Sequence, residues 1–164
     1  MSGSELERGP LEALAARWRA GWGGEGFESC CTPDVSYEDP VAVQPLRGIE
    51  ALDAHAVALR AALPDLRVDS IAPALEYGGN ACLPWRVAGT HRGEIGTVLP
   101  ATERYLTVHG VHYVELSDGF VRRARGFFDL YGAATQLGLL PARGGLGEAA
   151  LLMLRGYGLR RRAT

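Results

Sequence analysis

The sequence predicts a single α+β domain in which helices come first and strands follow. Two segments near the start, residues 10–22 and 49–63, place apolar side chains at helical spacing. After Pro64 the period changes to the alternation typical of strands, over four segments that end near residue 129. With 164 residues, 47% of them hydrophobic, the chain can bury one core or enclose an apolar cavity. We therefore expect helices that cover one face of a curved antiparallel sheet around a pocket.

The first helix is predicted over residues 10–22, because proline is favoured in the first turn of a helix and Gly21, Gly23 and Gly24 interrupt the helical pattern. A short helical piece over 25–31 and a short strand over 35–37 should follow. The strand ends at Asp39-Pro40. A second helix is predicted over 49–63, with Pro64-Asp65 after it.

Four strands are predicted over residues 66–76, 81–91, 105–116 and 120–129. Gly-containing turns at 77–80 and 117–119 join them, and a longer connection runs over 92–104. A short helix over 130–137 should complete the domain, and a weaker helix is predicted over 146–157. We expect residues 1–141 to form the domain and residues 142–164 a C-terminal extension with a basic end.

Composition excludes several functional classes. The net charge of −2 argues against nucleic acid as a partner, and no segment has the apolar length of a membrane span. Residues 1–14 lack the pattern of a secretion signal, so we expect a cytoplasmic protein. All seventeen basic residues are arginine, which excludes a lysine Schiff base. Neither the three cysteines nor the four histidines have metal-binding spacing, and no nucleotide-binding motif occurs, so we expect no metal and no cofactor.

A series of short motifs resembles the SnoaL-like polyketide cyclases over residues 11–141. They are Tyr37-Glu38-Asp39-Pro40, Leu46-Arg47-Gly48, Leu63-Pro64-Asp65-Leu66, residues 85–94, His109-Gly110, Asp118-Gly119, Phe128-Asp129 and residues 136–141. The resemblance implies the cone-shaped fold of the nuclear transport factor 2-like superfamily, which steroid isomerases and limonene epoxide hydrolases share. It also implies a cyclase or isomerase that closes a ring by intramolecular aldol chemistry, without cofactor or metal, on a carbonyl-rich, polyketide-like, apolar small molecule.

The same resemblance implies that Asp129 is the general acid/base, because it stands where the last strand meets the final short helix. Two departures from the family pattern occur. Residues 100–103 replace the usual Pro-Thr-Gly, and Arg125 stands where an aromatic residue is common. Asp is also a favoured residue at a helix start, so Asp129 could cap the helix that follows it.

Several other side chains are candidates for the site. Counting back by two from Asp129 places Phe127 and Arg125 on its face of the strand. His112 lies on an apolar face, where it belongs to the core or donates to a substrate oxygen. His91 either anchors a loop or lines the pocket. The aromatic residues that could line a flat pocket, or simply fill the core, are Trp18, Trp22, Tyr37 and Trp85.

Two alternatives to the cyclase remain open on the sequence. Asp39, Arg125 and Asp129 together would suit an epoxide hydrolase or epoxide-opening cyclase, although Asp39-Pro40 also suits a turn. A non-catalytic binding or assembly module is the other alternative, because function does not follow from fold. Finally, the outer face of the sheet is partly apolar, so we expect a homodimer through residues 107–113.

Overall fold

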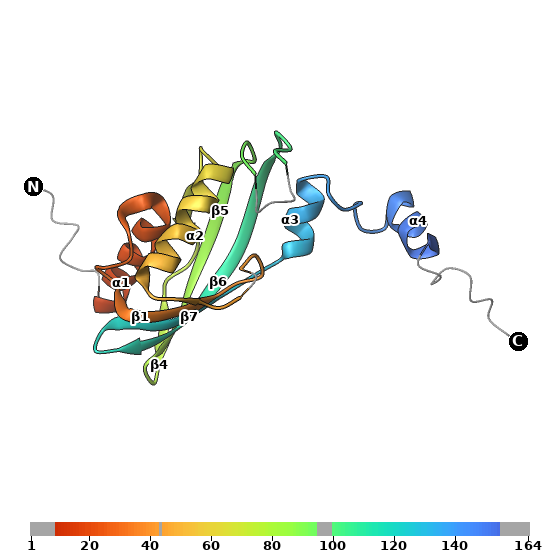
Figure 1. The fold of residues 1–164 in the computed structure, drawn as a ribbon. Coiled ribbons are helices and arrows are strands. Elements are labelled where there is room, and N and C mark those ends of the chain that lie inside the picture. Colours follow the sequence, from red (N-terminus) through yellow and green to blue (C-terminus); the bar gives the residue numbers. More distant parts are fainter. Residues whose placement is uncertain (1–8, 43, 95–99, 155–164) are drawn as a thin grey trace, which may run out of the picture.

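The computed structural model of the chain describes residues 9–42, 44–94 and 100–154. Helices α1 (Pro10–Ala20) and α2 (Ile49–Ala62) lie on one face of a curved sheet (Figure 1). Helix α1 starts with proline in its first turn and continues into a π-helical turn over Gly21–Glu25. Gly24, with φ of 117°, interrupts the helical backbone there. The helical segment therefore ends about one turn after Gly21 and not at Gly21 itself.

The sheet contains seven strands. They are β1 (Cys31–Glu38), β2 (Leu46–Arg47), β3 (Arg67–Ser70), β4 (Leu75–Tyr77), β5 (Asn80–Thr90), β6 (Tyr105–Ser117) and β7 (Phe120–Phe128). Their order is β2-β1-β7-β6-β5-β3, with β4 also paired to β5. All described pairs are antiparallel except β1 with β7, which run parallel. The α+β prediction is confirmed, and the sheet is mixed because its first strand joins its last.

Two predicted elements differ from the structure. The piece over 25–31 is a turn in which the N–H groups of Cys30 and Cys31 both donate to Phe27 O, and strand β1 begins directly after it. The strand expected over 66–76 is divided into β3 and β4. Pro73 lies in the gap, and its nitrogen has no hydrogen to donate to a neighbouring strand.

The main core lies between the helices and the concave face of the sheet. Its most deeply buried large side chains include Trp18 of α1, Phe27, and Leu52 of α2. Helix α3 (Leu130–Gln136) follows β7 and packs near one end of the sheet through Ala133 and Leu137, which join a second apolar cluster.

Helix α4 (Leu146–Leu154) lies beyond α3 and away from the sheet (Figure 1). The Tyr131 hydroxyl of α3 donates to Pro141 O and lies 3.4 Å from Glu148 Oε1 of α4. The last residues of the predicted helix, 155–157, lie outside the described residues. No helix in the described part of the chain has the length and apolar character needed to cross a membrane.

Candidate active site

An apolar cavity of about 260 Å³ lies between the sheet and helix α3. Its lining contains only apolar side chains: Pro40, Val41, Leu59, Leu63, Trp85, Val87, Leu106, Val108, Phe128, Leu130, Ala133, Ala134, Leu137 and Leu139. This volume and character suit a small, largely apolar molecule.

The cavity continues inward into a smaller space of about 50 Å³, because Leu59, Trp85, Val87 and Phe128 line both. The inner space adds Trp22, Val68, Tyr37 and His112. The alternation of strands directs Tyr37 of β1 and His112 of β6 to this concave side. Polar side chains therefore enter the cavity at its inner end.

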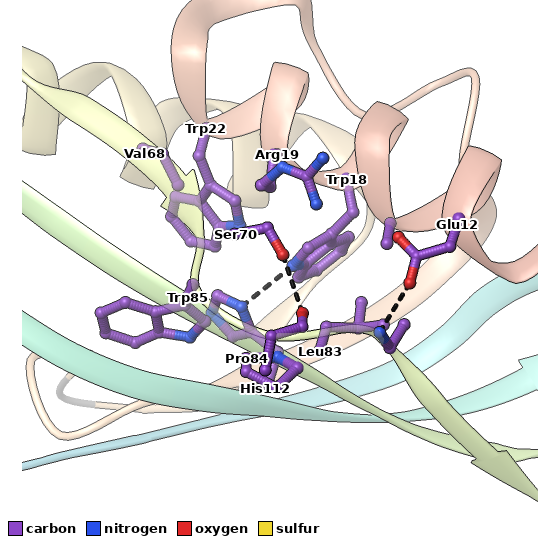
Figure 2. Close-up of a pocket in the computed structure, with 13 residues that line it drawn as sticks. Glu12, Trp18, Arg19, Trp22, Val68, Ser70, Leu83, Pro84, Trp85 and His112 are labelled. Atoms are coloured by element: carbon purple, nitrogen blue, oxygen red, sulfur yellow. Dashed lines mark hydrogen bonds between the residues drawn. The ribbon is translucent and has the colours of Figure 1, made fainter. Parts of the chain in front are cut away.

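A chain of hydrogen bonds links these polar groups. Trp18 Nε1 donates to His112 Nδ1 over 3.1 Å (Figure 2). Since Nδ1 accepts, the neutral ring carries its proton on Nε2, which lies 3.3 Å from Tyr37 Oη. The Tyr37 hydroxyl in turn donates to Asp39 Oδ2 over 2.9 Å. We call this arrangement the His112–Tyr37–Asp39 chain.

Gly126 of β7 leaves room for this chain. It pairs with His112 across the sheet. A Cβ atom at position 126 would lie 2.9 Å from Tyr37 Oη and 3.2 Å from Asp39 Cβ. The absence of a side chain at this inward position allows the tyrosine hydroxyl to approach the imidazole.

Asp39 is held by four hydrogen-bonding partners. Its Oδ2 accepts from Tyr37 and lies 3.0 Å from His55 Nε2, and its Oδ1 accepts from the N–H groups of Val41 and Ala42 at 2.7 Å. The side chain is 7% exposed. Burial acts to raise the pKa of the carboxyl, but the bonds from His55, Ala42 and Tyr37 together lower that pKa to about 2. Asp39 is therefore a firmly positioned carboxylate.

His112 and Tyr37 are uncharged at neutral pH. Burial lowers the pKa of His112 to about 3, and the nearby Asp39 charge offsets only part of this effect. Trp22 stacks on the His112 ring, with centroids 5.6 Å apart and planes 2° from parallel. Burial, followed by the charge and hydrogen bond of Asp39, raises the pKa of Tyr37 well above its usual value.

This geometry predicts a single tautomer for His112. In ¹⁵N–¹H spectra of histidine-labelled protein, we expect its ring to carry the proton on Nε2 and to remain neutral from pH 8 down to pH 4, because its pKa lies near 3. Trp18→Phe removes the donor to Nδ1 and should allow the other tautomer to form. A ring that titrates near pH 6.5, or an Nδ1–H tautomer in the unmodified protein, would contradict the assignment.

Asp129 does not lie in this cavity. Its side chain is 63% exposed, and its Oδ1 accepts from the N–H of Gly132 at 2.8 Å, so it caps helix α3. Arg143 lies 3.9 Å away. The capping role considered on the sequence is thus present in the structure. The catalytic role of Asp129 stays a prediction that this exposed position does not favour.

Arg125 and Phe127 lie on the outer face of the sheet, so the expectation that they line the pocket is wrong. They share this face with Asp129, as counting by two predicts, but Asp129 is exposed and does not line the cavity. A bulge lies further back in β7, where Val121 pairs with Leu116 and Arg123 with Glu115, which leaves Arg122 as an extra residue. The inward positions beyond the bulge are therefore 124, 126 and 128.

Arg125 instead donates to Glu38 Oε2 over 2.8 Å on the exposed side. Asp39 is buried behind Tyr37, whereas Asp129 caps α3 at the surface. The structure does not bring together the three residues expected for epoxide chemistry.

The remaining candidates fall into two groups. Tyr37, Trp22 and Trp85 line the inner cavity, whereas Trp18 is a core residue that contacts the site through His112. His91 is fully buried, and its Nδ1 accepts from the N–H of Thr102 at 3.2 Å. It is absent from the cavity lining, so it anchors the connection that follows β5 rather than binding a molecule there.

Sequence reasoning missed His55, which contacts Asp39 Oδ2. The signal lay in its spacing, because His55 follows Leu52 by three residues and precedes Leu59 by four, on the inward stripe of α2.

Within the residues that the structure covers, no three His, Cys, Asp or Glu side chains gather closely enough to hold a metal ion.

Helices packed on a curved mixed sheet around an apolar cavity define an α+β protein of the ketosteroid isomerase-like fold. A protein with that fold from Catenulispora acidiphila DSM 44928 aligns over 77% of this chain and 92% of its own, with 16% identity and a TM-score of 0.63. The profile of the SnoaL-like polyketide cyclases matches residues 11–137, and the chain belongs to this family.

Two further solved structures are similar to the chain. TsrD from Streptomyces laurentii aligns with 83% of this chain and 100% of its own, at 25% identity and a TM-score of 0.70. A protein from Jannaschia sp. CCS1, assigned as a SnoaL-like polyketide cyclase, aligns with 84% and 99%, at 24% identity and a TM-score of 0.67. Comparison with curated proteins finds no match.

Proposed function

We propose that this protein is a cofactor-independent cyclase or isomerase that forms an enolate from a carbonyl-rich, polyketide-like small molecule. The observation that carries this proposal is the His112–Tyr37–Asp39 chain at the inner end of an apolar cavity. Membership of the SnoaL-like family supports the reaction class. The apolar lining favours a substrate with a largely hydrocarbon skeleton.

His112 would stabilise the substrate oxygen. Its contact with Tyr37, at 3.3 Å, is the longest in the chain and lies beyond the usual range of a strong hydrogen bond. The Nε2–H can therefore donate to a substrate carbonyl oxygen in place of Tyr37 with little loss of free energy. In a site without water, such a donor favours the negative charge that develops on an enolate oxygen.

Tyr37 and Asp39 would move the proton. The proton of a substrate C–H passes to Tyr37 Oη while the phenolic proton passes to Asp39 Oδ2, and the C–H electron pair becomes that of the enolate. After ring closure or isomerisation, the reverse transfer returns the proton to the product. Because the pKa of Asp39 is about 2, the C–H must be acidified by two carbonyl groups or by a carbonyl and an aromatic ring.

Deuterium exchange into β-tetralone tests this proposal without the natural substrate, because its benzylic C–H lies beside a carbonyl. In heavy water, NMR should show faster exchange with the protein than with buffer, with no metal or nucleotide added. Tyr37→Phe should bring the rate close to that of buffer. A wild-type protein that binds β-tetralone without accelerating exchange would favour the non-catalytic binding module instead.

We also propose that the protein forms a homodimer through the outer face of its sheet. Val111 of β6 pairs with Phe127 of β7 on this face, and Tyr113 and Phe127 are 39% and 49% exposed. Light scattering should show a dimer at micromolar concentration, and Phe127→Glu should shift it towards monomer. Val57→Glu, a change at an exposed position of α2 on the opposite side of the sheet, tests whether an added charge is sufficient by itself. A wild-type monomer at that concentration would contradict the prediction.

A further inference from the structure

Two tryptophans that line the inner cavity have buried N–H groups without an acceptor. Trp22 and Trp85 are 4% and 7% exposed, and neither indole nitrogen has a hydrogen-bond partner among the described residues. The third tryptophan, Trp18, donates to His112. A buried donor without an acceptor is unfavourable, because it has lost its hydrogen bonds to water.

Both unpartnered indoles line the inner cavity beside His112. Figure 2, which draws a small neighbouring pocket between α1 and the sheet, shows Trp18, Trp22 and Trp85 close to His112. The Trp85 ring centroid is 5.2 Å from that of His112, and the Trp22 ring stacks on the imidazole. An indole nitrogen donates but does not accept, so each of these groups requires an acceptor atom.

We infer that Trp22 and Trp85 donate hydrogen bonds to oxygen atoms of the bound molecule. The cavity then selects an aromatic or polycyclic compound with carbonyl oxygens over the same carbon skeleton without them. This inference rests on the proposed function for the location of the site, but it does not require catalysis. Together with His112 Nε2–H, the two indoles supply donors for more than one oxygen.

The indole N–H signals provide a direct test. The chain has three tryptophans, so ¹⁵N–¹H spectra contain three indole signals, which Trp→Phe variants assign. On addition of β-tetralone, at least one of the Trp22 and Trp85 signals should move downfield as a hydrogen bond forms. The Trp18 N–H already has an acceptor and should move least. Tetralin, which has the same rings without the oxygen, should move none of them downfield.

Binding ratios provide the second test. We expect β-tetralone to bind more tightly than tetralin, and loss of one donor in Trp22→Phe or Trp85→Phe should reduce this preference roughly three- to tenfold. Phe128→Leu is the matched control, because Phe128 lines the same space without a polar atom and should change both affinities alike.

Three results would overturn the inference: no saturable binding of β-tetralone, equal affinity for the two compounds, or indole signals that do not move downfield. Failure of the proposed function has a different signature, because β-tetralone would then bind and shift the signals without faster deuterium exchange.

Discussion

Asp39→Asn should slow deuterium exchange into β-tetralone by about 10²–10⁴-fold, the usual contribution of a general acid–base group. The amide can still accept a hydrogen bond from Tyr37, but it cannot take up the phenolic proton. Asp129→Asn should leave exchange unchanged, because Asn caps a helix about as well as Asp and position 129 lies at the surface. The comparison therefore separates the two carboxylates by role.

The same pair of variants can reverse the assignment. If Asp129→Asn abolishes exchange while Asp39→Asn retains it, the base is Asp129, as the family resemblance implies. Melting temperatures and β-tetralone affinity must accompany the rates, since Asp39 also accepts from two backbone N–H groups and contacts His55. Exchange should be measured well below the melting temperature of each variant.

Acid should destabilise the protein strongly through His112. In the unfolded chain this histidine binds a proton below about pH 6.5, whereas in the folded protein its pKa is about 3. The unfolded state therefore binds more protons between these values, and stability falls as the pH falls through that window. The shift corresponds to a loss on the order of 4–5 kcal/mol between pH 7 and pH 3. Urea unfolding at a series of pH values measures it.

His112→Gln is the matched variant, because glutamine does not titrate. Its stability should be nearly independent of pH between 6.5 and 4, and a wild-type curve equally flat there would contradict the assignment. Asp39 affects the stability of the fold at lower pH than His112 does. Its carboxylate contributes about 2 kcal/mol above pH 3.8, and this is lost as the pH falls towards its folded pKa of about 2.

Local periodicity was sufficient to predict most of the fold. Helix α2 and strands β5, β6 and β7 lie within about two residues of the predicted ranges, because each has apolar residues at its own period and a turn signal at its ends. The parallel pairing of β1 with β7 could not be predicted in this way. It joins residues about ninety positions apart, and no local pattern specifies it.

The alternation of the strands predicted part of the site. His112 and Trp85 lie on strands whose period of two continues unbroken along this stretch, so both point to the concave side as expected and line the inner cavity. The sequence had left each of them open between the core and the pocket. Arg125 and Phe127 were expected in the pocket because they share a strand face with Asp129, but Asp129 caps helix α3 at the surface and that face is the outer one. The contact between His55 and Asp39 depends on how α2 packs on β1, which is also non-local.

The close contact at Gly126 should make positions 37 and 126 vary together among related chains. The Gly126 backbone is ordinary strand, so the requirement for glycine is one of space alone: any Cβ would meet the Tyr37 hydroxyl at 2.9 Å. A lineage could gain a side chain at 126 only after position 37 had become smaller, and could gain a tyrosine at 37 only while 126 remained glycine. Related chains should therefore divide into two groups, one with this pair and one with a larger residue at 126 and a smaller one at 37. Intermediates that carry both large residues should be absent.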